Sequence, residues 1–307
     1  VDDISPDGAL HAFVLRATLA HGVITKLDAS DARAMPGVAA VITCQDLLDA
    51  GVKVDISGGS VRNRDGTRGA KPLRPVLALD RVRYVGEAVA MVVADTYANA
   101  KDAAEAILFD VDDLPAHVAL GARGHALHAE APDNQAFDWG LGDEAATQAA
   151  IAAAAHVVTL DVADNRVICN AMEPRGCFAE MVDGRLHFSF NGQGVWGMKG
   201  DLAKMLDMEK SEVRVTNPDV GGGFGMKAFN YPEYPVVAFA SRMLGKPVRW
   251  MSERTEAMLS DNGGRDLTTT ATMAFDEDFK IVAYHLDTIA NMGAYNSGFA
   301  QFIQTDL

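Results

Sequence analysis

The stretch PDVGGGFGMKAF, residues 218–229, places three glycines, a phenylalanine and a fourth glycine in a row. It follows a strand-like segment at 211–215 and leads through Lys227 toward a predicted helix, and in such a loop successive backbone N–H groups can form an anion-binding concavity. The spacing matches neither a dinucleotide-binding Rossmann turn nor a Walker loop. Glycine clusters also supply positive φ at ordinary turns. Four glycines around one aromatic residue favour the binding interpretation.

Length and charge limit the classes of protein that this chain can represent. With 307 residues and 49% hydrophobic content, the chain can bury a sizeable core and predicts about two domains. A formal charge of -15 argues against binding to nucleic-acid phosphates. The longest apolar runs, at 89–94 and 236–240, are far shorter than the ~20 residues that span a bilayer, so we expect no membrane insertion.

The cysteines and histidines give no metal-site pattern. Cys44, Cys169 and Cys177 have no CxxC spacing, which suits a reducing compartment, and they are too few for the four thiolates of an iron–sulfur cluster. We interpret them as small buried hydrophobic residues. His125 and His128 lie in a predicted loop without further ligands at zinc-site spacing, so a zinc site is not expected.

The pattern along the chain predicts a compact α+β segment at 1–120, a connecting segment at 121–142 and a second α/β segment at 143–307. The continuous apolar run at 89–94 predicts a strand buried on both faces, followed by an Ala-rich helix. Asp143 is a plausible N-cap for a helix over 143–156.

In the second segment, further patterns predict four elements or pairs of elements. They are a strand at 184–194, a helix at 198–209, a helix closed by Gly245 and followed by a strand within 233–250, and a long hairpin at 267–290.

Several polar residues near these elements are candidates for function. Gln193 follows a strand and has glycine neighbours; such an amide is ordinarily solvated, but it can donate to an oxo group or anion where glycines leave space for a bulky ligand. For Glu173 and Arg175 we predict a buried ion pair that shapes the core, in preference to a catalytic role. Arg265 could meet a carboxylate or phosphate, although an ordinary surface charge is the default.

A series of motifs resembles the large, molybdopterin-binding subunit of the molybdenum hydroxylases, the xanthine dehydrogenase and aldehyde oxidase family. The motifs, in chain order, are VDDI, RATLAHGVI, GVAAVIT, RVRYVGEAVAMVVADTYANAKDAAEAI, DDLPAHV, NAMEPRGCFAE, NGQGVWGMKGDLAKML and VTNPDVGGGFGMK. The combination is specific, and it covers essentially the whole chain. It implies an α/β-hammerhead domain at 1–120 and the first, incomplete part of a molybdopterin-binding domain at 143–307.

The resemblance also implies roles for residues. The glutamine matching Gln193 donates a hydrogen bond to an oxygen on the metal, and the loop matching Gly222, Gly223, Phe224 and Gly225 packs against the metal's ligands and the pterin. The implied reaction is hydroxylation of an electron-poor carbon of an aldehyde or N-heterocycle with water. The implied cofactor is molybdenum–molybdopterin in its cytosine dinucleotide form, with no protein side chain of this chain ligating the metal.

Family large subunits are about twice this length or more, so the resemblance implies missing parts. The catalytic glutamate base would lie in the absent C-terminal half, and the expected partners are that remaining part, a small iron–sulfur subunit and a medium FAD subunit. We therefore expect this chain alone to be inactive. Two alternatives stay open: the carbon monoxide dehydrogenase branch, which MEPRGC does not separate, and a non-catalytic truncated remnant or assembly module.

Overall fold

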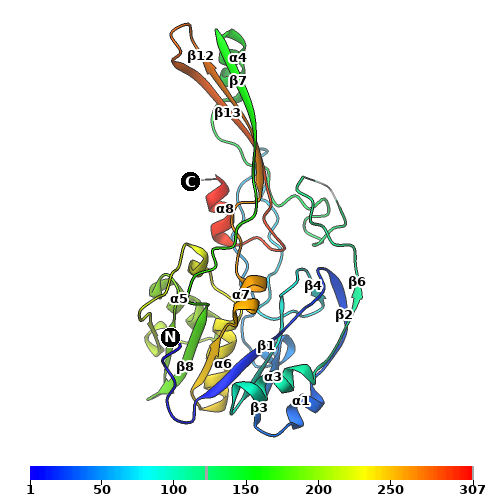
Figure 1. Cartoon of the computed structure of the whole chain (residues 1–307), viewed down its shortest axis with the longest axis vertical. Coiled ribbons are helices and arrows are strands. Elements are labelled where there is room, and N and C mark those ends of the chain that lie inside the picture. The colour runs from blue at the N-terminus through cyan, green and yellow to red at the C-terminus, as the bar shows by residue number, and fades with distance from the viewer. Residues whose placement is uncertain (122–123, 306–307) are drawn as a thin grey trace. The chain divides into compact units, whose positions relative to one another are not determined.

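The computed structural model describes residues 1–121 and 124–305, which form two compact units (Figure 1). The first unit comprises Val1–Ser57, Leu73–Ala116 and Cys169–Asn262, and the second comprises Gly58–Pro72, His117–Ile168 and Gly263–Leu307. Both units draw on sequence from either side of the predicted connection. The domain boundaries at 120 and 143 stay a prediction about segments of the sequence.

A seven-stranded mixed sheet forms the centre of the first unit. In spatial order its strands are β10 (Val213–Thr216), β9 (Arg185–Phe190), β8 (Gly176–Val182), β11 (Val248–Met251), β1 (Leu10–Arg16), β5 (Ala88–Ala94) and β3 (Val38–Thr43). Strand β1 pairs in parallel with β11, where Leu10 lies opposite Val248, and antiparallel with β5. The first strand of the chain is therefore enclosed by the sheet.

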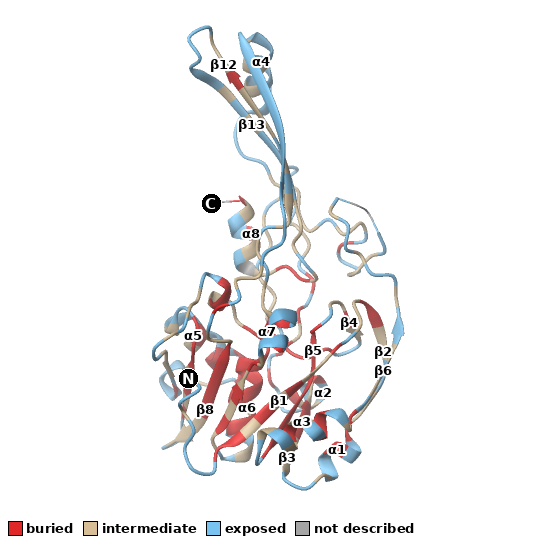
Figure 2. Ribbon diagram, in the orientation of Figure 1, coloured by how far each residue is buried: buried red, intermediate tan, exposed pale blue. Residues whose placement is uncertain are grey.

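Strand β5 is completely buried because helices cover both faces of the sheet at this point (Figure 2). Met91 and Val93 belong to the core cluster that contains α5 (Val195–Met205) and α6 (Glu233–Leu244). The alternate residues, including Ala90 and Val92, belong to the cluster with α1 (Ser30–Ala34) and α3 (Tyr97–Glu105). This alternation follows from the two-residue period of a strand. It confirms the strand and helix predicted from the apolar run.

Shorter elements complete the first unit. They are β2 (Gly22–Asp28), β4 (Arg81–Val82) and β6 (Leu108–Asp113), which form a three-stranded sheet, with helices α2 (Cys44–Asp49) and α7 (Arg254–Ser260) and 3-10 turns η1 (Lys210–Glu212) and η2 (Met226–Ala228).

The second unit is built on a three-stranded antiparallel sheet. Its strands are β7 (His156–Asp164), β12 (Leu267–Phe275) and β13 (Ile281–Ala290), and its helices are α4 (Glu144–Ala153) and α8 (Gly298–Thr305). Helix α4 packs against β12 and β13, where Ala274 is completely buried. Strands β12 and β13 confirm the predicted hairpin.

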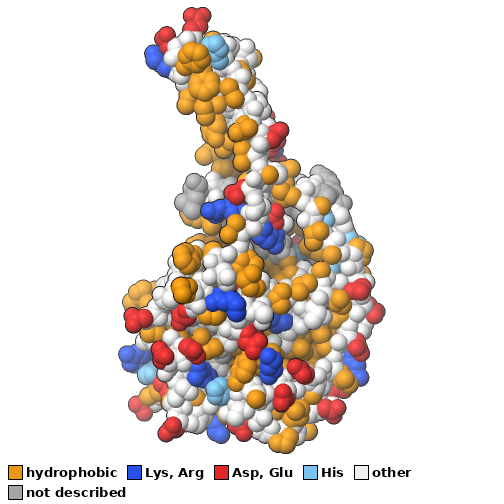
Figure 3. All heavy atoms as spheres, viewed as in Figure 1, with side chains coloured by type: hydrophobic (Ala, Val, Ile, Leu, Met, Phe, Trp, Pro, Cys, Tyr) orange, Lys and Arg blue, Asp and Glu red, His pale blue; other side chains and the backbone are white. Residues whose placement is uncertain are grey.

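The opposite face of this sheet is apolar and open. Directly paired residues share a face, which gives the apolar rows Val158–Met273–Tyr284 and Leu160–Ala271–Leu286. The side chain of Leu160 is 62% exposed, and that of Val158 is 58% exposed. Figure 3 shows hydrophobic side chains gathered along this part of the chain.

Helix α4 begins as the sequence predicts, because the Asp143 side chain accepts a hydrogen bond from the backbone N–H of Ala146 at 2.9 Å. Replacing Asp143 with alanine removes this cap and is expected to destabilise the helix by about 1 kcal/mol. Hydrogen exchange of the α4 amides should accelerate accordingly. Asp143→Asn is the control, because asparagine caps equally well. Equal exchange in the two variants would contradict the prediction.

None of the helices in the described part of the chain is long and apolar enough to cross a lipid bilayer.

Candidate functional site

The glycine loop follows β10 and has a backbone that only glycines accommodate easily. Gly222 has φ +102 and Gly225 has φ +78, both in the range that side chains disfavour. Two other glycines are needed for close approach. A Cβ on Gly221 would lie 2.5 Å from Cβ of Glu173, and one on Gly223 would lie 2.6 Å from Cδ of Gln193.

The loop presents a row of backbone donors. In the described part of the chain, no oxygen accepts a hydrogen bond from the N–H groups of Gly222, Gly223, Phe224 or Gly225. Phe224 has φ +53, and its side chain is 72% exposed. The loop leads only into the short turn η2, not directly into the predicted longer helix, because Gly225 is left-handed and α6 begins later, at Glu233. Exposed N–H groups in succession are suited to bind an anion or an oxygen-rich group.

Gln193 lies beside this loop. It is in the turn between β9 and α5, and its backbone N–H donates to the carbonyl oxygen of Lys227 at 3.0 Å. Its side chain packs against Gly223, in the space that a Cβ on this residue would fill. The side chain is exposed and forms no hydrogen bond with another described residue. The structure thus brings together all five residues singled out from the sequence, and the carboxamide is available to a ligand.

The predicted ion pair between Glu173 and Arg175 is wrong. Glu173 contacts Lys227, with 3.4 Å between Oε2 and Nζ, and Arg175 contacts Glu233 and Asp261 at 2.7 Å and 2.5 Å. Glu173 and Arg175 therefore belong to two separate clusters of charged residues. In each cluster the opposite charge comes from a residue that is distant in sequence. The prediction that Arg175 has a structural role in the core agrees with its complete burial.

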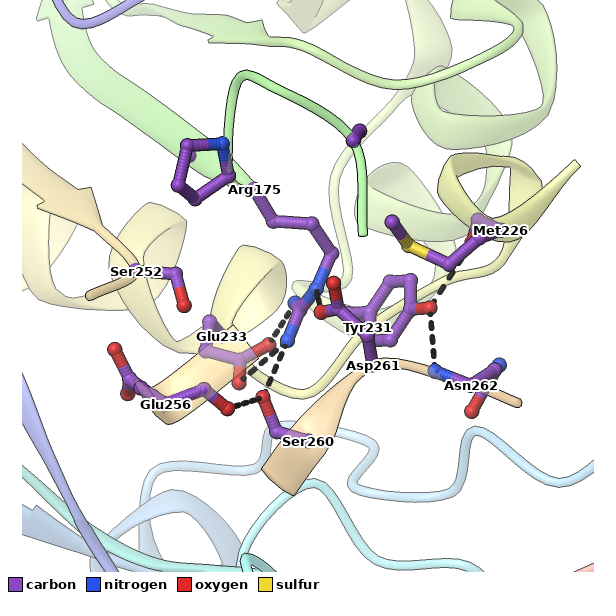
Figure 4. A network of polar contacts seen from close by, with 12 residues as sticks. Arg175, Met226, Tyr231, Glu233, Ser252, Glu256, Ser260, Asp261 and Asn262 are labelled. Atoms are coloured by element: carbon purple, nitrogen blue, oxygen red, sulfur yellow. Dashed lines mark hydrogen bonds and ion pairs between the residues drawn. The ribbon is translucent and has the colours of Figure 1, made fainter. Parts of the chain in front are cut away.

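Arg175 is the centre of a buried network of polar contacts (Figure 4). Its guanidinium also donates to Ser260 at 2.9 Å and lies 3.6 Å from the ring centroid of Tyr231. Burial would raise the pKa of Glu233, but Arg175 and Arg16 outweigh it and hold that pKa at about 2. Glu233 is therefore ionised at neutral pH, and the network joins β8 to α6 and α7 through charge-assisted hydrogen bonds.

The three cysteines differ in their burial. Cys44 and Cys177 are buried as predicted, and burial raises the pKa of both thiols, that of Cys44 to about 11. Cys169 is partly exposed, with its Sγ 3.8 Å from the carbonyl oxygen of Phe224. Among the described residues, no group of three or more His, Cys, Asp or Glu side chains is placed to hold a metal ion.

The remaining candidates lie in the second unit. Nε2 of His128 is hydrogen bonded to the carbonyl oxygen of Ala294 at 2.7 Å. Arg265 is 64% exposed and lies 3.6 Å from Asp164, so it is a surface charge with a carboxylate neighbour.

Sequence reasoning missed two buried polar residues next to the loop. Lys227 was noticed only as the residue leading out of the loop, yet it is 0% exposed. Asn191 is also fully buried, accepts from the N–H of Gly176 at 2.9 Å and donates to the carbonyl oxygen of Pro174 at 2.7 Å. The tripeptide Asn-Gly-Gln after an apolar strand was the available signal, since asparagine at such a point often bonds backbone groups.

Two models of known protein families match the sequence that forms this site and most of the rest of the first unit. A family model described as a molybdopterin cofactor-binding domain matches residues 127–306, and one described as the a/b hammerhead domain of aldehyde oxidase and xanthine dehydrogenase matches residues 1–115. The chain belongs to the molybdenum hydroxylase family. The resemblance and fold class predicted from the sequence are thereby confirmed, and the chain corresponds to part of a large subunit.

Relatives of this molybdenum hydroxylase chain are substantially longer. It is 32% identical over 97% of its length to the carbon monoxide dehydrogenase large chain of Hydrogenophaga pseudoflava, and 33% identical over 96% to the nicotine 6-hydroxylase large subunit of Paenarthrobacter nicotinovorans. These matches cover 38% and 36% of the relatives. The solved quinoline 2-oxidoreductase from Pseudomonas putida 86 matches with a TM-score of 0.80 at 32% identity, covering 96% of this chain and 37% of that one.

Proposed function

We propose that this chain forms the N-terminal part of a molybdopterin-binding large subunit that hydroxylates an electron-poor carbon of an aldehyde or N-heterocycle with water. The observation that carries the proposal is the row of N–H groups at 222–225 beside the carboxamide of Gln193, none of which is hydrogen bonded to another described residue. The named substrates of two relatives, nicotine and quinoline, are N-heterocycles and support that substrate class.

The residues present fit such a cofactor. A Cβ on Gly225 would meet nothing within 4 Å, so the loop leaves open space for a bulky group there, while the absence of a side chain on Gly223 leaves room for Gln193. The N–H groups of Gly222, Gly223, Phe224 and Gly225 would donate to cofactor oxygens. The Gln193 side chain would donate a further hydrogen bond and orient the bound group. When bound, the molybdenum cofactor supplies the metal centre that accepts two electrons from the substrate.

Other polypeptides would complete the enzyme. Because the chain spans little more than a third of its relatives, we assign the catalytic base to the remaining part of the molybdopterin domain and to no residue here. Three cysteines are too few for an iron–sulfur cluster, so electrons would pass to a small iron–sulfur subunit and then to a medium FAD subunit. We propose a cytoplasmic complex and the cytosine dinucleotide form of the cofactor.

The second candidate is the carbon monoxide dehydrogenase branch. It is favoured by the 32% identity to a carbon monoxide dehydrogenase large chain and by a TM-score of 0.80 to the solved enzyme from Oligotropha carboxidovorans. Assays of the purified complex with carbon monoxide, an aldehyde and an N-heterocycle would separate the two candidates.

Replacing Gln193 with alanine tests the role of its carboxamide. Loss of one preorganised donor typically costs about 10²–10³ in kcat, so we expect such a loss in the assembled complex while molybdenum stays bound. Gln193→Glu is the informative companion, because it keeps the shape but turns the donor into an anion. Unchanged hydroxylation in Gln193→Ala with full metal content would overturn the assignment.

A further inference from the structure

Glu173 holds the start of the glycine loop. Its Oε2 accepts a hydrogen bond from the backbone N–H of Gly221 at 2.8 Å, and its own backbone N–H donates to the carbonyl oxygen of Gly221 at 3.1 Å. The two residues are in close contact, because a Cβ on Gly221 would lie 2.5 Å from Cβ of Glu173. Both backbone polar groups of Gly221, its N–H and its carbonyl oxygen, are therefore hydrogen bonded to Glu173.

The same carboxylate oxygen also reaches the end of the loop. Nζ of Lys227 lies 3.4 Å from Oε2 of Glu173, and the Lys227 side chain is 0% exposed. The backbone of Lys227 in turn donates its N–H to the carbonyl oxygen of Gly223 at 3.2 Å and accepts from the N–H of Gln193 at 3.0 Å. Oε2 of Glu173 therefore contacts both Gly221 at the start of the loop and Lys227 at its end. Lys227 in turn accepts the hydrogen bond from the backbone of Gln193.

The buried lysine makes the carboxylate necessary. Burial lowers the pKa of Lys227, and the charge of Glu173 opposes this change. Burial would raise the pKa of Glu173, but hydrogen bonds from Gly221 and Asn191 and the charge of Lys227 together lower it. Without Glu173 the buried ammonium group of Lys227 would lose the carboxylate that lies 3.4 Å away, and a protein avoids a buried charge with no close partner by moving the side chain toward water. Such a movement would shift the backbone that holds Gln193.

We propose that Glu173 is a positioning residue that acts through Gly221 and Lys227 to fix where the N–H groups of 222–225 and the side chain of Gln193 lie. The inference rests on the proposed function, since it concerns the loop assigned to the cofactor. Glu173 itself contacts neither substrate nor cofactor in this assignment. Its effect on hydroxylation is indirect, through the geometry of the donors.

The test uses the complete complex carrying Glu173→Ala or Glu173→Gln. We expect exchange of the Gly221 amide to accelerate at least about tenfold in Glu173→Ala, since its acceptor is lost. Glu173→Gln keeps an acceptor of the same size but no charge, so its effect on this amide should be smaller. In both variants we expect bound molybdenum per complex to fall, and kcat of the loaded fraction to fall with KM little changed. Asp219→Asn is the matched control, because this exposed carboxylate in the same loop forms no hydrogen bond with another described residue.

A double variant isolates the pairing. Glu173→Gln combined with Lys227→Met removes both charges together, so its loop exchange and molybdenum content should be closer to the parent than those of Glu173→Gln alone. Unchanged exchange across 221–227 in the single variants would overturn the proposal. So would faster exchange with unaltered molybdenum content and kcat. If the parent complex contains no molybdenum, the proposed function fails, while the exchange data still decide whether Glu173 holds the loop.

Discussion

Replacing Arg175 with methionine is expected to lower the free energy of unfolding by about 3–5 kcal/mol. The substitution leaves the buried carboxylate of Asp261, which is 3% exposed, without the guanidinium that lies 2.5 Å away. Glu233 keeps only Arg16, whose Nη2 is 2.5 Å distant. Urea denaturation of the chain, followed by tryptophan fluorescence, measures the loss, and Trp250 beside Arg175 reports on this region.

Two variants serve as controls for this prediction. Arg64→Met removes the ion pair between Arg64 and Asp138, whose side chains are 57% and 45% exposed, and should leave the free energy of unfolding nearly unchanged. Arg175→Lys keeps the charge but not the planar fork that reaches both carboxylates, so its cost should lie between the other two. A loss for Arg175→Met as small as that for Arg64→Met would show that the buried network contributes little.

Replacing Gly222 with valine is expected to weaken cofactor binding about tenfold or more. A β-branched residue at φ +102 is strained by roughly 1–3 kcal/mol, and its Cβ would lie 2.8 Å from the ring of Phe224. The loop can relieve the strain only by turning its N–H groups to new directions, and each 1.4 kcal/mol so lost is a factor of ten in affinity. Molybdenum and pterin content of the purified complex would be measured.

Gly200→Ala is the control for Gly222→Val. Gly200 lies inside α5, where an added Cβ would have no atom nearer than Lys210 Cε at 3.9 Å, so alanine should stabilise the helix by up to about 1 kcal/mol. Its cofactor content should equal that of the parent. Full cofactor content in Gly222→Val would contradict the proposed role of the loop.

The sequence predicted those parts of the fold that depend on local pattern. The helix after Asp143, the buried strand at 89–94 and the hairpin at 267–290 were predicted because capping, composition and apolar spacing all agree within a few residues. The strand His156–Asp164 was missed although Val158, Leu160 and Val162 alternate with Thr159 and Asp161, which is the two-residue period of a strand.

The loop backbone and Gln193 were predicted from the sequence, but the partners of the charged residues around them were not. The glycines at 221–225 carry a local signal, since their conformation excludes side chains. The partners of charged residues carry none: Glu233 lies 58 positions after Arg175, and nothing in MEPRGC indicates that Arg175 pairs with it rather than with Glu173. Burial of Lys227 likewise depends on the packing of distant segments.

Because β1 lies inside the sheet, it cannot complete its strand pairing until late in translation. Its parallel neighbour β11 begins at Val248, so a ribosome adding about 5–20 residues per second completes that neighbour roughly 10–50 s after β1 has emerged. Until then β1 can pair only with β5 along one edge, and its other edge stays unsatisfied. A nascent chain halted before β11 would display an open, aggregation-prone strand edge.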